Sequence, residues 1–374
     1  MSLIDQINEW LLKKSQVNIL ELTSSGLRWI SGTSLDNRFA LHTLEKLQTE
    51  EPYLEKTDGI PKLNREILIR DLRKITSYRF PLEKHASIVL SDTVFNLGDF
   101  QIPAVAVKSG FLPLLEREIH KSTTMNYKDF AVRHEFGEKR DNRVPVHYCA
   151  LHRGFLDELK KACNDAGLIP LSIQPVFTGH AHILKAAAPD SRHPSIFLHF
   201  DNDALTAGIY NRDGLRAVHV INSGFNDLLK TLMNARQCNR TDAFTELTTS
   251  LILLDDPNSD AQNEIETYRI LEATFVDFLQ KVYGFLLLYS NDHPDESGFV
   301  RIVLSGESTR IRNIEKLVSA NLGIPAVILN SVIDPAFSTL SLPECETPAT
   351  LTAILGNLQL APWRLERFDR IMVA

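Results

Sequence analysis

The chain has 374 residues, of which 44% are hydrophobic and 23% charged, and its formal net charge is -7 at pH 7. These proportions are typical of globular proteins and argue against a disordered, fibrous or coiled-coil protein. The acidic balance leaves no basic surface of the kind that neutralises phosphates, so a dedicated nucleic-acid-binding protein is not expected. The length favours two or more packed units.

The sequence predicts neither a membrane span nor an export signal. No apolar run approaches the roughly 20 residues of a transmembrane helix, and Asp5 and Glu9 interrupt the segment in which a signal peptide is apolar. We therefore expect a cytoplasmic protein. The cysteines lack C-x-x-C spacing, which indicates reduced thiols rather than disulfides or a zinc site; they are Cys149, Cys163, Cys238 and Cys345.

Residues 1–16 are expected to form an amphipathic N-terminal helix, with Leu3, Ile7 and Leu11 on one face. Its polar face carries a nearly balanced charge, which favours docking on protein over docking on lipid. Two strands are then predicted at 17–22 and 27–31, around a tight turn at 24–26. A polar stretch follows, and the spacing of apolar residues predicts a helix at 65–77.

The middle of the chain mixes strands and helices in an α+β manner. Strands are expected at 87–90, 104–107, 144–151 and 168–173, and helices at 112–120 and 154–166. Gly167 is well placed to end the second helix in a left-handed conformation.

From residue 195 the pattern repeats its opening. Three strands are predicted at 196–200, 206–210 and 215–221, followed by helices at 226–234, 241–253 and 264–290. The last helix is expected to be buried on more than one side, because its apolar residues surround it: Ile270, Leu271, Val276, Leu279, Val282, Leu286 and Leu287. A strand at 299–304, a helix at 310–321 and a strand at 326–329 predict a right-handed parallel crossover.

This duplicated layout resembles a known fold family. The segments that carry the resemblance are NILELTSSGLRW (18–29), VHYCALHRGFLDELKKACNDAGLIPLSIQP (146–175), IFLHFDNDALTAGIYNRDGLRAVHVINSG (196–224) and VLSGESTRIRNIEKLVSANLGIPAVILN (303–330). They are similar to the actin-like ATPases, and more specifically to the PilM proteins of type IV pilus assembly, cytoplasmic relatives of FtsA. The likeness extends from about residue 18 to residue 356.

The resemblance implies an α/β, actin-like ATPase fold made of two ribonuclease-H-like halves with an inserted α+β subdomain. On this chain the first half starts at 17–84, the inserted subdomain and the return to the first half take 85–190, and the second half with a helical insertion takes 191–374. In such a family the halves close over a nucleotide. Two hairpin turns face its phosphates, and a late Ser-Gly-Gly turn approaches the adenosine.

MgATP binding requires a carboxylate near the metal, small residues whose N–H groups reach phosphate, and glycines where a side chain would collide. At the first turn the family's Asp-x-Gly-x-x-x-x-Lys pattern aligns with Glu21, Thr23 and Arg28. At the second turn its Asp-x-Gly pattern falls on His199 and Asp201. The third turn keeps Gly306 but continues with Glu307 and Ser308.

These departures favour a scaffold that has lost or greatly weakened nucleotide hydrolysis. The vestigial nucleotide site is predicted at Glu21, Thr23, Ser24, Ser25, Arg28, His199, Asp201, Asn202, Asp203, Gly306, Glu307 and Ser308. No catalytic residue and no metal site is predicted, and weak binding of ATP and Mg²⁺ stays open.

Two alternatives remain for these residues. In a shifted register Asp201 or Asp203 supplies a carboxylate and Thr206 a hydroxyl, which would give an active ATPase or a small-molecule kinase with Glu21 and Arg28 around MgATP. Alternatively, Glu21, His199 and Asp201 are only polar turn residues at strand ends.

Other motifs are weaker. His180 and His182 lie two apart in a predicted helix and point away from each other, so structural histidines are favoured over a metal site. Ser305 lacks the G-x-S-x-G pattern of a nucleophile elbow, which argues against a serine hydrolase. The acidic stretch 255–260 lacks the EF-hand order of ligands and is expected to be a loop.

The resemblance implies a cytoplasmic scaffold of a type IV pilus or a type II-like secretion assembly. It would be recruited to the inner face of the inner membrane by the cytoplasmic tail of a PilN-like membrane protein, alongside other components of the machine. In the family that tail is a short extended peptide, and strand edges and grooves suit such peptides. The groove is expected between about His85 and Leu151.

Overall fold

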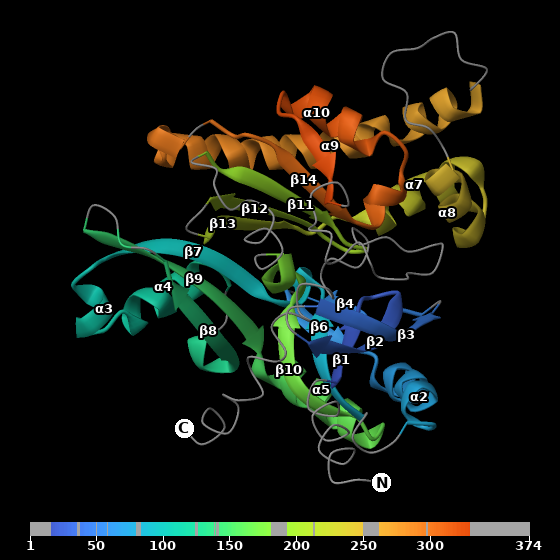
Figure 1. The fold of residues 1–374 in the computed structure, drawn as a ribbon, viewed down its shortest axis with the longest axis horizontal. Helices are drawn as coiled ribbons and strands as arrows, with labels where there is room; N and C mark the ends of the chain where they lie inside the picture. The colour runs from blue at the N-terminus through green and yellow to red at the C-terminus, as the bar shows by residue number, and fades with distance from the viewer. Residues whose placement is uncertain are drawn as a thin grey trace.

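The computed structural model places a β-hairpin at the start of each of two α/β halves (Figure 1). The structure describes residues 16–35, 38–49, 51–57, 59–79, 84–123, 126–137, 139, 142–180, 193–211, 214–249, 262–296 and 298–329. The predicted N-terminal helix, the stretch 255–260, His182 and Cys345 lie outside these residues.

The first half is built on a five-stranded sheet of order β10-β6-β1-β2-β3. Its strands are β1 (Gln16–Leu22), β2 (Gly26–Leu35), β3 (Arg38–Gln48), β6 (His85–Leu90) and β10 (Ile169–Pro175). β1, β2 and β3 pair antiparallel, whereas β6 and β10 continue the sheet in parallel. The helices α2 (Arg65–Thr76) and α5 (Arg153–Asp165) supply apolar residues to its core, and the short strands β4 (Leu54–Thr57) and β5 (Ile60–Leu63) form a hairpin.

The second half repeats this arrangement with the order β13-β12-β11-β14-β15. Its strands are β11 (Ser195–Phe200), β12 (Leu205–Asn211), β13 (Gly214–Ile221), β14 (Ile302–Gly306) and β15 (Ala326–Ile328). Every residue of the central strands β11 and β14 is buried, as expected for parallel strands covered on both faces. The helices are α7 (Phe225–Arg236), α8 (Arg240–Thr249), α9 (Gln262–Asp292) and α10 (Ile314–Leu322), with the short turns η4 (Pro294–Glu296) and η5 (Glu307–Arg310).

A three-stranded antiparallel sheet of order β7-β9-β8 is inserted into the first half. It contains β7 (Asn96–Pro103), β8 (Phe130–Phe136) and β9 (Arg143–His152), the helices α3 (Ala106–Ser109) and α4 (Leu112–Ser122), and the turns η2 (Asp92–Val94) and η3 (Tyr127–Asp129). β7 packs beside β13 of the second half (Figure 1). There the Val218 N–H donates a hydrogen bond to Asp99 Oδ1 at 3.3 Å.

Three expectations about these elements are wrong or incomplete. The predicted strand 104–107 is a turn and the start of α3, because β7 already ends at Pro103 and Val105 is 73% exposed. The strands β3, β4, β5, β7 and β8 are not among the predicted ones. The long helix α9 is not buried on all the predicted sides, since Val276 and Leu287 are 36% and 48% exposed.

Among the described residues, none of the helices combines the length and the apolar character that crossing a membrane requires.

Candidate functional site

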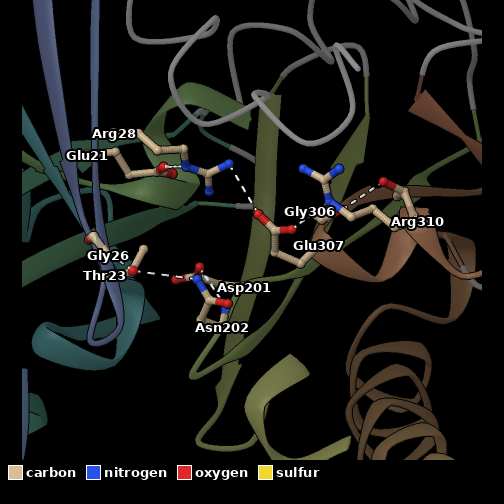
Figure 2. Close-up of polar contacts among 10 residues, drawn as sticks. Glu21, Thr23, Gly26, Arg28, Asp201, Asn202, Gly306, Glu307 and Arg310 are labelled. Atoms are coloured by element: carbon tan, nitrogen blue, oxygen red, sulfur yellow. Dashed lines mark hydrogen bonds and ion pairs between the residues drawn. The ribbon is translucent and has the colours of Figure 1, made fainter. Parts of the chain in front are cut away.

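The turn of the first hairpin lies against the turn of the second, so the two halves meet where the sequence predicted a nucleotide cleft (Figure 2). The Ser24 backbone N–H donates to Asp203 Oδ2 at 3.2 Å, and the Ser24 hydroxyl donates to Asp203 Oδ1 at 2.6 Å. The Asn202 side-chain amide also reaches Thr23 Oγ1 at 3.5 Å. The carboxylate of one half is therefore bound by the turn of the other.

Local hydrogen bonds hold each turn in shape. In the first turn, the Thr23 N–H and hydroxyl both donate to the Gly26 carbonyl, at 3.0 and 3.2 Å. In the second turn, the Asp201 N–H donates to the Ala204 carbonyl at 2.8 Å, and the Phe225 N–H, at the start of α7, donates to the Asp201 carbonyl at 2.9 Å. The second turn is thus fixed to the N-terminus of α7.

Gly224 allows this close packing. A Cβ atom at position 224 would lie 2.5 Å from the Ala204 nitrogen and 2.6 Å from the Asp201 carbonyl oxygen. No side chain fits there without moving the backbone of the turn. The sequence prediction missed this glycine, although it stands in the quoted segment that ends at Gly224.

A chain of four charged side chains crosses from one half to the other (Figure 2). Glu21 on β1 pairs with Arg28 on β2. Arg28 Nη1 lies 3.2 Å from Glu307 Oε1, and Glu307 Oε2 lies 2.8 Å from Arg310 Nε. Glu307, which occupies the position of a glycine in the family's third turn, therefore binds the arginine that occupies the position of the family's lysine.

The two carboxylates of this chain differ in their pKa. Burial raises the pKa of Glu21, and Arg28 only partly opposes this. Burial also acts to raise the pKa of Glu307, but Arg28 and Arg310 outweigh it and the pKa lies below its ordinary value. Glu307 is thus the more strongly held anion of the pair.

Asp201 and Asp203 place two carboxyl groups at the second turn. Burial raises the pKa of Asp201 to about 8, and the charges of Asp203 and Glu21 add to the effect. Asp203 accepts a third hydrogen bond from the Asn226 side-chain amide at 2.8 Å. The turn therefore presents one carboxyl that is neutral at pH 7 and one carboxylate whose oxygens are bound by the protein.

His199 and Ser305 do not face the cleft as reactive groups. His199 Nδ1 lies 2.7 Å from the Ser305 hydroxyl, and both residues are buried. The His180 ring packs on His199, with 4.3 Å between ring centroids. Burial lowers the pKa of His199 to about 3, with a smaller contribution from Arg28, so the imidazole is neutral at pH 7.

Gly306 ends β14 with φ of +89°, a conformation that favours glycine. A Cβ atom there would lie 2.1 Å from the Phe200 carbonyl oxygen. The structure thus places the predicted third turn beside the end of β11. Ser308, which follows Glu307, is fully buried and does not line the cleft surface.

A cavity of about 590 Å³ opens beside these turns, between the halves. Sequence reasoning found its hairpin residues but missed most of the wall, which includes Lys46, Leu47, Gln48, Thr49, Phe225, Asn239, Arg240, Thr241, Phe244 and Arg310. Residues 46–48 belong to the unexpected strand β3 and Thr49 follows it, while α8 carries no motif that marks a ligand. No group of three or more metal-ligating His, Cys, Asp or Glu side chains occurs in the described part of the chain.

No protein-family model and no curated protein sequence matches the chain. Its structure is similar to that of the PilM-PilN type IV pilus biogenesis complex, with a TM-score of 0.73 and 15% identity over 92% of this chain and 98% of that chain. It also resembles MreB5 of Spiroplasma citri bound to AMPPNP, with a TM-score of 0.54 and 12% identity over 95% of this chain and 98% of that chain. For MreB5 bound to ADP, the TM-score is 0.53 and the identity 12%, over 95% of this chain and 99% of that chain. The chain therefore has the actin-like ATPase fold, in a form similar to PilM, as the sequence predicted.

Proposed function

We propose that this protein is a scaffold of a type IV pilus or a related secretion assembly, which binds the cytoplasmic tail of a PilN-like inner-membrane protein and has a degenerate nucleotide cleft. The similarity in fold to the PilM of a PilM-PilN complex, over nearly the whole of both chains, supports the choice of assembly. In this proposal the partner's tail recruits the protein to the inner face of the membrane.

The observation that carries the loss of nucleotide chemistry is the bonding between the two hairpin turns. A phosphate at the first turn would need its backbone N–H groups. The Ser24 N–H is already bound to the Asp203 carboxylate. The Arg28 side chain, which could neutralise a phosphate, lies between Glu21 and Glu307.

These residues do not fit MgATP. The Asp203 carboxylate at the second turn accepts hydrogen bonds from Ser24 and Asn226, and the Glu307 carboxylate at the third turn pairs with Arg28 and Arg310. These groups bind one another, and a phosphate or a hydrated metal ion would have to displace those contacts. We therefore assign no catalytic step to this cleft.

The inserted sheet offers a site for an extended tail. β8 is at the edge of the order β7-β9-β8, and an extended peptide adds to such an edge through main-chain hydrogen bonds. Beside this edge the rings of Phe111, His134 and Phe136 pack together, with centroids 4.6 to 5.4 Å apart. Such rings can form pockets for the tail's side chains.

The tail is tested by fluorescence anisotropy with labelled synthetic tails of PilN-like proteins and the full chain. We expect saturable binding, no binding of a scrambled peptide, and weaker binding to Phe136→Ser. The matched control is Leu288→Ser on α9, because both side chains are apolar and exposed, by 40% and 67%. If no tail bound, or if both variants behaved alike, the proposed partner site would be wrong.

The cleft is tested by thermal unfolding with millimolar MgATP. Free ligand at about a hundred times Kd stabilises a protein by roughly 2.7 kcal/mol, which is measurable as a rise in Tm. We expect no rise for the wild type. A clear rise, together with phosphate release, would instead favour an active ATPase or a small-molecule kinase.

A further inference from the structure

The long helix α9 carries an exposed apolar stripe on the side that faces away from its own core. Val276, Tyr283 and Leu287 are 36%, 55% and 48% exposed, and the exposed Gln280 lies between them. We call these four residues the α9 face. Their spacing of four, three and four residues places them on one side of a helix. In Figure 1, α9 lies along the outer side of the second half.

The opposite side of α9 is fully used within the chain. It packs into the core of the second half through Leu271, Phe275, Phe278, Leu279, Val282, Leu286 and Tyr289. A helix with apolar residues on two sides is buried on two sides. Among the described residues, the chain covers only one of these sides, which leaves the second open to a neighbour.

We propose that the α9 face docks against the α9 face of a second copy of this chain, with the two helices antiparallel. This inference does not depend on the proposed function. Residues that alternate at spacings of four and three, as in the α9 face, form the contact between two packed helices, where each side chain inserts between those of the facing helix.

The sizes of the side chains select the antiparallel direction. A two-fold axis at Gln280 places Ala273 opposite Leu287 of the second copy, and Val276 opposite its Gly284. The space over Gly284 is open, with no atom within 4 Å of a Cβ built there. At these two pairs of positions a large side chain thus meets a small one, which allows the helices to approach closely. A parallel pair would place leucine on leucine and alanine on alanine.

The charges beside the face fit the same direction. Asp277 and Lys281 lie on one flank and pair within the helix at 2.6 Å. The same two-fold axis brings Asp277 of one copy opposite position 283 of the other, close to its Lys281. Two ion pairs across this contact therefore become available, one at each side of the axis.

The size of the face sets the strength of the contact. From residue 273 to residue 287 the helix is about 21 Å long, and one helix pair of this length buries less than the roughly 800 Å² per partner of a stable interface. We therefore expect a weak dimer that forms as the protein is concentrated.

Sedimentation velocity of the full chain, from low micromolar to submillimolar concentration, tests the dimer. We expect a concentration-dependent dimer that Leu287→Asp weakens by more than about tenfold, and that Asp277→Lys weakens less. The double variant Asp277→Lys with Lys281→Asp should recover the dimer, since it restores both pairs across the helix–helix contact. Leu288→Asp is the matched control, because Leu288 is exposed on α9 outside the face.

Cysteine cross-linking tests the direction. Under mild oxidation, a mixture of Ala273→Cys and Leu287→Cys chains should give a disulfide-linked dimer, whereas Ala273→Cys alone should give none beyond the wild-type background. Cross-linking of Ala273→Cys to itself would overturn the antiparallel arrangement. A wild type that stays monomeric throughout, or a dimer insensitive to Leu287→Asp, would overturn the proposal, as would an effect of that variant on vesicle binding alone.

Discussion

Removing the Asp203 carboxylate is the most direct test of how the two halves are joined. Asp203→Ala deletes three hydrogen bonds, two to Ser24 and one to Asn226. Hydrogen bonds to charged groups contribute roughly 1.5 to 3 kcal/mol each, but these three share the two oxygen atoms of one carboxylate, so their contributions do not simply add. We expect a net loss of about 2 to 4 kcal/mol in the free energy of unfolding.

The assay is a thermal double-mutant cycle. An unfolding entropy of about 2.1 cal/mol/K per residue gives about 0.8 kcal/mol/K for 374 residues, so a loss of about 3 kcal/mol lowers Tm by about 4 °C. Ser24→Ala alone removes only the 2.6 Å hydroxyl bond and should cost about half as much. The double variant should be little less stable than Asp203→Ala.

Additive losses would refute the reasoning. If the coupling between positions 24 and 203 were below about 0.5 kcal/mol, the two side chains would act independently. The bond between the turns would then contribute nothing to the closed arrangement, and its place in the proposed function would fall.

Three further changes probe the same region. Burial is the main reason why the pKa of Asp201 is raised from 3.8 to about 8, so between these pH values the folded chain keeps a proton that the unfolded chain loses. The stability of the protein therefore falls as the pH rises from 3.8 to about 8. Asp201→Asn should reduce this fall, which is measured as Tm at a series of pH values. Gly306→Ala places a Cβ 2.1 Å from the Phe200 carbonyl oxygen and should lower the free energy of unfolding by more than about 3 kcal/mol. The control Gly323→Ala is also at positive φ but in open space, and should lower it by about 1 kcal/mol. Urea unfolding measures both values. Glu307→Gln breaks the ion pairs to two arginines and should lower Tm by a few degrees. Because the three side chains are nearly buried, salt screens these pairs little, so the loss should be similar at low and high salt; an unchanged Tm would contradict a contribution of the pairs to stability.

The fold was largely predictable because its repeated unit has strong local signals. The hairpin strands are short apolar runs on either side of polar turns, and Gly167 and Gly306 both adopt the positive φ that their positions require. Of the missed strands, β3, β7 and β8 lack such signals. β8, for example, is an edge strand that exposes the polar residues His134 and Glu135, so it alternates too weakly to be recognised.

The site was predictable only in part. The turns could be located from their spacing, but the bond from Ser24 to Asp203 joins residues 179 positions apart, and no local pattern reports such a contact. Similarly, the pairing of Arg28 with Glu307 depends on how two sheets face each other. Val276 and Leu287 were expected to be buried because periodicity shows that a surface is apolar, but not whether the same chain covers it.

The bond between the two hairpin turns has a mechanical consequence. In a cleft closed by a ligand, the strength of closure varies with the concentration of that ligand and resets when the ligand leaves. The hydrogen bonds between Ser24 and Asp203 are part of the polypeptide, so their strength does not vary with the concentration of a nucleotide, and nucleotide hydrolysis does not open them. In the proposed assembly such a protein would be a permanent structural connection, and any step that is timed by nucleotide turnover would take place in another component.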